Sequence, residues 1–143
     1  MEFVAEYKIS PVPKPRMSRR DKWQLRKCVA EYWAFRDLVK LSRVKVPEAG
    51  AHVVFHIPMP KSWSAKKKRE MNGQPHTQKP DLDNLTKALL DAIYGDDSVV
   101  WSISAEKRWA RRGKIEIIAG PSWHSNAQGS PQRDALALAK RFF

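Results

Sequence analysis

Short apolar runs bounded by prolines alternate along this chain with longer stretches in which apolar residues recur every three or four positions. The runs at residues 2–9 and 52–57 predict strands. Residues 21–43 predict a helix with a wide apolar stripe, because the spacing places those residues on one side. The stripe consists of Leu25, Cys28, Val29, Tyr32, Phe35 and Val39. Its spacing also suits a partner helix, but burial in the chain's own core is the favoured interpretation.

The second half of the chain adds a helix and two strands. Residues 82–94 predict a helix that ends at Gly95. Residues 99–109 and 114–119 predict strands around a turn, and hence a C-terminal β-hairpin. Residues 58–80 are rich in Lys, Ser, Gly, Asn and Pro and predict a long loop. The elements together predict an α/β protein of the α+β type, with two main helices packed on a small mixed sheet.

The composition changes after Gly120, where Gly, Pro, Ser, Asn and Gln become frequent. Such a composition is typical of a linker. Residues 133–143 carry enough apolar side chains for a short helix, which would need packing to persist. The sequence therefore predicts one domain over residues 1–120, followed by a linker and a flexible C-terminal tail over 121–143.

The charge balance and the cysteine content limit the classes of protein to which this chain can belong. The chain has 143 residues, 27 Lys plus Arg against 15 Asp plus Glu, a net charge of +12 and one cysteine, Cys28. A single cysteine excludes an internal disulfide and fits a reducing cytoplasm. No secretion signal or membrane span is visible, so we expect an intracellular protein. A strongly basic chain points to nucleic acid, because neutralising phosphates releases counterions.

The cations gather in clusters rather than spreading evenly, which favours DNA contact over a merely basic surface. The predicted DNA-binding residues are Lys61, Lys66, Lys67, Lys68, Arg69, His76, Lys79, Arg16, Arg19, Arg20, Arg111 and Arg112. Trp63 and Trp109 lie inside two of these clusters. Their rings could stack on unpaired bases, although for a single Trp ordinary core packing is the favoured interpretation.

Acidic residues gather in one short segment of this basic chain. Asp81, Asp83, Asp91, Asp96 and Asp97 lie in a window whose single cation is Lys87. Repelling carboxylates are stabilised by a cation between them, and hard oxygen ligands suit Mg²⁺ or Mn²⁺. Each acid also has an ordinary explanation as a helix cap, a helix-start charge or a turn residue. Taken together they predict a metal site, because capping alone requires only one carboxylate.

The helix over residues 82–94 presents its polar side chains opposite its leucines. Lys87 follows Asp83 by one turn and could stabilise negative charge at the metal. The alternative is a surface salt bridge that contributes little. His52 and His56 share a strand face, and without a third ligand packing is favoured over zinc binding.

The stretch KPDLDNLTKALLDAIYGDD, residues 79–97, resembles the signature of the RusA family of Holliday-junction resolvases, particularly its phage-borne members. The family pattern joins a DxDN helix start to a Lys four residues later and to an Asp-Asp pair before the next strand. The matching positions here are Asp81, Asp83, Asn84, Lys87, Asp96 and Asp97. The resemblance extends over about residues 1–120 and does not include the tail.

The resemblance implies that Asp81, Asp83 and Asp97 bind Mg²⁺ and that Lys87 assists catalysis. Asp96 adjoins the position that the family uses, and Asp91 and Asn84 are implied to support the site. The resemblance also implies a homodimer that acts on branched DNA and makes paired, symmetric nicks in a four-way junction. Sequence alone leaves two alternatives, a general nuclease that cuts flaps or forks and a DNA-binding module without catalysis.

Overall fold

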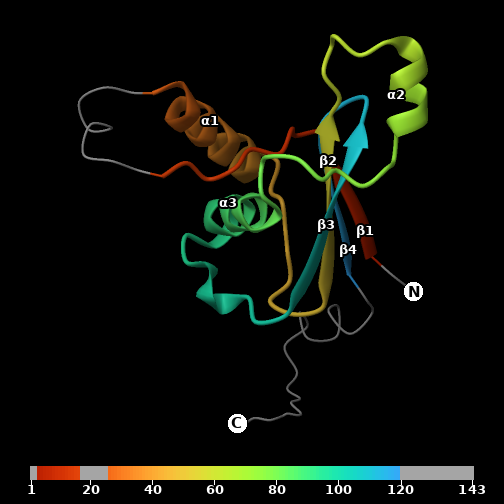
Figure 1. Cartoon of the computed structure of the whole chain (residues 1–143). Coiled ribbons are helices and arrows are strands. Elements are labelled where there is room, and N and C mark those ends of the chain that lie inside the picture. The colour runs from red at the N-terminus through yellow and green to blue at the C-terminus, as the bar shows by residue number, and fades with distance from the viewer. Residues whose placement is uncertain (1–2, 17–25, 120–143) are drawn as a thin grey trace.

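The computed structural model describes residues 3–16 and 26–119, except for the side chains of Phe3 and Asp97. Figure 1 shows the elements as they follow along the chain. They are β1 (Phe3–Tyr7), α1 (Lys27–Leu41), β2 (Ala51–Pro58), α2 (Ala65–Met71), α3 (Leu82–Tyr94), the 3-10 turn η2 (Asp97–Val99), β3 (Ile103–Ala110) and β4 (Lys114–Ala119). The predicted tail over residues 121–143 and the predicted start of the first helix lie outside the described residues.

The strands form one four-stranded mixed sheet in the order β1-β4-β2-β3. β2 and β3 are parallel, whereas β4 is antiparallel to both β1 and β2. The predicted α+β fold with a mixed sheet is therefore confirmed. The predicted C-terminal strand–turn–strand unit is also present, since β3 and β4 are consecutive and run in opposite directions.

β3 and β4 do not hydrogen-bond to each other, because β2 lies between them. The connection over residues 111–113 thus passes across the end of β2. A Cβ at Gly113 would overlap the side chain of Ser10, so this close crossing favours glycine. Local sequence predicts a turn here but carries no information about a third strand inserted between the two.

Both α1 and α3 cover the same face of the sheet (Figure 1). The core between them contains apolar side chains from both helices and from the central strands. Its fully buried members include Phe35, Val39, Leu85, Leu89, Val53, Phe55, Ile115 and Ile117. Tyr32, Phe35 and Val39 of the predicted stripe are buried within the chain itself. The internal-core interpretation is confirmed for these residues but is wrong for Cys28, which is exposed, and Leu25 lies outside the described residues.

The prediction that residues 58–80 form only loop is wrong. Residues 65–71 form α2, whose N-cap Ser64 accepts a hydrogen bond at 3.2 Å from the backbone N–H of Lys67. Ala, Lys, Arg, Glu and Met are good helix formers, and the Ser cap stabilises the first turn. α2 has no buried residue and projects beyond the end of the sheet (Figure 1).

The strand predicted from residue 99 begins later, at Ile103. Residues 97–99 instead form the 3-10 turn η2, and Trp101 is 78 % exposed.

Among the described residues, no helix combines the length and the apolar character that crossing a lipid bilayer requires.

Candidate active site

The start of α3 presents its carboxylates outward. Asp81 occupies the N-cap position, but its side chain makes no capping hydrogen bond. The alternative explanation of Asp81 as a side-chain helix cap is therefore not supported. Its carboxylate is about half exposed and lies 3.3 Å from the ammonium of Lys79. Asp83 and Asn84 in the first turn of α3 are also exposed. Two acidic side chains are thus available to a ligand at this helix end.

Lys107 of β3 fixes the chain that leads into α3. Its Nζ donates hydrogen bonds to the carbonyl oxygens of Gln78 at 2.6 Å and Pro80 at 2.7 Å. The strand therefore holds the segment from which Asp81 and Asp83 emerge. The sequence does not indicate this role, because the partners of Lys107 lie 27 and 29 residues away in the chain.

An open groove of about 610 Å³ lies between α3 and β3. Its polar side consists of Asp83, Asn84, Thr86 and Lys87. Its apolar side consists of Leu82, Leu90, Ile103 and Ala105. The structure therefore brings together Asp83, Asn84 and Lys87, as the spacing on one helix predicts. The groove adds an apolar wall from β3 that no local sequence pattern indicates.

Asp91 does not line the groove. It is 9 % exposed, and its carboxylate accepts a hydrogen bond at 2.5 Å from Nζ of Lys14. The backbone N–H of Lys14 also donates to the carbonyl oxygen of Asn84 at 3.4 Å. Because a carboxylate this deeply buried needs a cationic partner, Lys14 stabilises α3 through Asp91. Sequence reasoning missed this pair, whose members are 77 residues apart.

Asp96 and Asp97 follow the other end of α3. The Asp96 carboxylate accepts a hydrogen bond at 3.0 Å from the backbone N–H of Ser98, which lowers the pKa of Asp96 from its ordinary value. Asp97 begins η2, and its side chain lies outside the described residues. A metal site that joins Asp97 to Asp81 requires the chain after Gly95 to run back toward the start of α3. The returning strand is β3, and Asp97 precedes it.

Asp97 follows the C-terminal end of α3, whereas Asp81 occupies its N-cap. Because the side chain of Asp97 lies outside the described residues, its metal-binding role beside Asp81 and Asp83 stays a prediction.

The donor set at the start of α3 fits a hard divalent cation. Asp81 and Asp83 supply exposed carboxylates and Asn84 an amide oxygen, and Mg²⁺ is commonly held by one or two carboxylates with its remaining positions filled by water. The described side chains contain no cluster of three or more His, Cys, Asp or Glu placed to bind a metal. That statement does not cover the side chain of Asp97.

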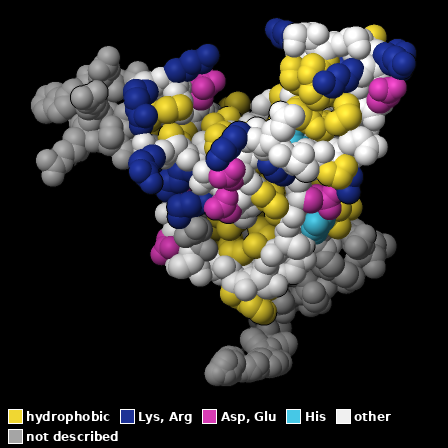
Figure 2. Space-filling model, viewed as in Figure 1, with side chains coloured by type: hydrophobic (Ala, Val, Ile, Leu, Met, Phe, Trp, Pro, Cys, Tyr) yellow, Lys and Arg dark blue, Asp and Glu magenta, His cyan; other side chains and the backbone are white. Residues whose placement is uncertain are grey.

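The predicted DNA-binding cations lie at separate places on the molecule. Five of them are on and before α2, where Lys61, Lys66, Lys67 and Arg69 are exposed and Lys68 is half-buried. Arg111 and Arg112 are exposed in the turn between β3 and β4, and Arg16 is exposed before the undescribed segment. Arg19 and Arg20 lie outside the described residues. Figure 2 shows Lys and Arg side chains over α2 and again over α1 and α3.

The prediction that His76 contacts phosphate does not fit its position. His76 is 4 % exposed, and its ring lies 4.2 Å from that of Trp109. Burial lowers the pKa of His76 from its ordinary value, with a further contribution from Lys107. Because its ring is covered, His76 does not present it to a phosphate at the surface. Trp109 is itself buried and packs on Trp63 at 4.8 Å, so the core interpretation of Trp109 holds.

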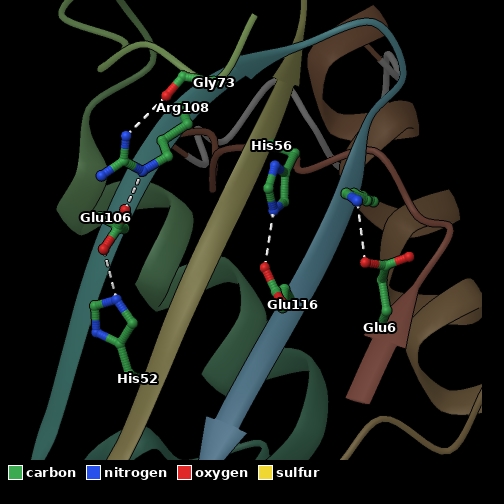
Figure 3. A network of polar contacts seen from close by, with 8 residues as sticks. Glu6, His52, His56, Gly73, Glu106, Arg108 and Glu116 are labelled. Atoms are coloured by element: carbon green, nitrogen blue, oxygen red, sulfur yellow. Dashed lines mark hydrogen bonds and ion pairs between the residues drawn. The ribbon is translucent and has the colours of Figure 1, made fainter. Parts of the chain in front are cut away.

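The other two predicted histidines lie on the sheet face away from α1 and α3 (Figure 3). His52 contacts Ser104 and Glu106, each at 2.7 Å, and His56 contacts Glu116 at 3.2 Å. Glu106 also accepts a hydrogen bond from Arg108, and these two contacts lower the pKa of Glu106. The histidines therefore take part in cross-strand polar pairs, as the packing interpretation predicts.

Comparison with known proteins finds a matching family and a partial relative. The sequence model of a family described as "Endodeoxyribonuclease RusA" matches residues 8–118. A stretch of 74 residues is 36 % identical to the "Uncharacterized protein YqaN" of Bacillus subtilis (strain 168). That match covers 46 % of this chain and 52 % of the relative, so the chain spans about half of the relative's length.

Proposed function

Because the chain belongs to the RusA family of endodeoxyribonucleases, we propose that it resolves Holliday junctions by magnesium-dependent, paired hydrolysis of phosphodiester bonds. The observation that supports this function best is the groove beside α3. It presents Asp83, Asn84 and Lys87 together on a chain whose net charge is +12. A basic surface attracts the DNA backbone, and an acidic patch within it suits a divalent cation.

Asp81 and Asp83 are the proposed metal ligands, and Asn84 supports them. Both carboxylates are exposed at the start of α3, and the Asp81 side chain makes no capping hydrogen bond. When bound there, Mg²⁺ supplies charge neutralisation for the phosphate and lowers the pKa of a bound water; Mn²⁺ has the same ligand preference. Lys79, at 3.3 Å from Asp81, offsets the repulsion between the two carboxylates.

Lys87 is the proposed cation for the leaving oxygen. It lies one helical turn beyond Asp83 and lines the same groove. An ammonium there stabilises negative charge that develops during phosphodiester cleavage. Lys107 orients the segment before α3 through its bonds to Gln78 and Pro80. Its role is to position Asp81 and Asp83 and not to touch the substrate.

The proposed assembly is a homodimer with one active site per subunit. Paired incision of a four-way junction requires two active sites, and a dimer supplies one from each copy of α3. A closed two-fold dimer also matches the two-fold symmetry of a four-way junction. Two sites related by that axis would cut opposed strands at equivalent positions.

Incubation with defined DNA forms tests the proposed function. The substrates are a four-way junction, a linear duplex, a flap and a Y-form, each with Mg²⁺ and with EDTA. We expect junction cleavage in Mg²⁺ alone, with symmetric nicks and much slower cutting of the other forms. Equal cutting of flaps and forks would indicate a general structure-selective nuclease. Junction binding without cleavage in any divalent metal would indicate a DNA-binding module.

A further inference from the structure

Arg36 of α1 is a partly buried cation whose charge no described acidic residue neutralises. It follows the buried Phe35 and lies one turn beyond the buried Tyr32. Its Nε is buried and has no hydrogen-bond partner among the described residues. Its guanidinium lies 4.8 Å from the ring centre of Trp33, which is 43 % exposed. Arg36 therefore stands at the border between the core stripe and the surface.

The charged groups that act on Tyr32, one helical turn before Arg36, are three cations and one carboxylate. Tyr32 lies within the electrostatic range of Lys14, Lys87, Arg36 and Asp91. Asp91 is paired with Lys14 at 2.5 Å, so its charge is already compensated. Lys14 also bonds to α3 through the carbonyl oxygen of Asn84. The N-terminal segment, α1 and α3 thus meet around Tyr32 (Figure 1).

Arg36 cannot lose its unpaired charge by releasing a proton, because the guanidinium of Arg stays charged at all ordinary pH values. Leaving a buried Nε–H donor without an acceptor costs free energy. An ion pair would compensate for this cost, but no described acid pairs with Arg36. A bound anion supplies the missing acceptor. Arg is suited to phosphate, whose oxygens match its planar set of N–H donors.

We propose that Arg36, between α1, α3 and the N-terminal segment, is a phosphate-binding residue that holds the DNA backbone beside the active-site groove. The ring of Trp33 fixes the guanidinium plane from one side by a cation–π contact. Asp91, which pairs with Lys14 of the N-terminal segment, is one helical turn from Lys87 on α3. The place where the N-terminal segment meets α3 is therefore close to Lys87. A phosphate at Arg36 therefore places a neighbouring part of the strand toward the groove. This inference rests on the proposed function for the identity of the polyanion.

Binding of a four-way junction in EDTA over a range of KCl concentrations tests the proposal without requiring cleavage. Loss of one phosphate contact reduces the slope of log K against log salt by about 0.9. We expect that reduction for Arg36→Gln. The matched control is Lys27→Gln, which removes one charge from the exposed start of the same helix, nine residues away and on its opposite side. We expect the control to retain the wild-type slope.

Thermal unfolding with inorganic phosphate tests the site independently of DNA. At matched ionic strength, phosphate should raise Tm above the value in chloride for the wild type and for Lys27→Gln. A shift of roughly 3–5 °C is expected when phosphate is tenfold above its Kd. Arg36→Gln should lose most of that shift. Arg36→Lys keeps the charge without the planar donor set, and it should keep the salt slope but bind the junction more weakly.

The two measurements separate the possible failures. A wild-type protein that binds no DNA but is stabilised by phosphate through Arg36 would refute the proposed function and keep the anion site. Equal slopes for wild type and Arg36→Gln, or equal losses for Arg36→Gln and Lys27→Gln, would overturn the proposal. An unchanged phosphate-induced shift in Arg36→Gln would also overturn it. If Arg36→Gln does not fold, the affinity for the junction is compared between the wild type and Arg36→Lys, and equal affinities would overturn the proposal.

Discussion

Asp83 combines exposure, a groove position and proximity to Lys87, and it is the best single residue on which to test the site. Asp83→Asn keeps the shape of the side chain and removes its charge. We expect junction cleavage to fall by at least about 100-fold, since a metal ligand affects the rate directly. Junction binding should remain or tighten, because a repulsive charge is lost. Cleavage and binding are measured on the same preparation.

The control for this change is Asp37→Asn, the same substitution at an exposed position on α1. It should cleave at the wild-type rate. Normal cleavage by Asp83→Asn would contradict the assignment of the metal site.

His76 gives a pH dependence whose sign follows from its burial. Burial lowers its pKa in the folded protein, so the unfolded chain takes up the proton first as pH falls. His76 thus favours folding above its ordinary pKa of about 6.5, and this contribution decreases as pH falls toward the folded-state value. We expect Tm to decrease between pH 7.5 and pH 5.5 by more in the wild type than in His76→Phe.

The comparison requires only the difference between the two proteins, because other groups titrate equally in both. A change of Tm with pH that is the same in both proteins would show that His76 protonates freely in the folded state.

At the scale of elements, the local sequence pattern predicted the helices and strands that are defined by their own residues. The bounds of α3 and β4 were predicted correctly, because leucine spacing and Gly95 define the helix and alternating isoleucines define the strand. α2 was missed, because its run of cations contains no apolar stripe. The position of β2 between β3 and β4 depends on long-range pairing, which no local pattern contains.

The candidate site also has features that the sequence predicted and features that it did not. The arrangement of Asp83 and Lys87 follows from their spacing on one helix and was predicted. The contact of Lys14 with α3 was not predicted, and neither was the contact of Lys107 with the segment before α3. A lysine has no spacing signal for a partner that folding brings near from a distant part of the chain.

The link between the N-terminal segment and α3 leads to a stability prediction. Lys14→Met leaves the Asp91 carboxylate buried without its cation. Since the Lys14 side chain is 31 % exposed and solvent screens part of the interaction, we expect a loss of about 2 kcal/mol in the free energy of unfolding rather than the larger cost of a fully buried pair. Chemical denaturation measures this change.

A second variant identifies the cause. Lys14→Met combined with Asp91→Leu removes both charges and should recover most of the stability. A double variant no more stable than Lys14→Met would show that Lys14 stabilises the fold by some other contact.

At the scale of the whole molecule, the proposed dimer predicts how the two nicks are linked. A mixed dimer with one Asp83→Asn subunit has one working site if each site draws Asp83 from a single chain. We expect it to convert a supercoiled cruciform plasmid to open circles, whereas the wild-type dimer gives linear product. Differently tagged subunits allow the mixed dimer to be purified, and gel electrophoresis separates the products.

Light scattering provides the accompanying measurement of mass. A monomer at the working concentration, or efficient linearisation by the mixed dimer, would contradict the two-site assembly and leave a nuclease that cuts one strand at a time.

The strand order also has a consequence for how the polypeptide acquires its shape. β4 pairs with both β1 and β2 and is the last described strand in the chain. Until residues 114–119 have been synthesised, β1 has no strand to pair with, and β2 has only β3, which follows it by more than 40 residues. Most contacts in the sheet join distant parts of the chain, which slows folding. The ribosome therefore releases almost the entire domain before the sheet can close, and exposed strand edges during that interval are open to chaperones or to aggregation.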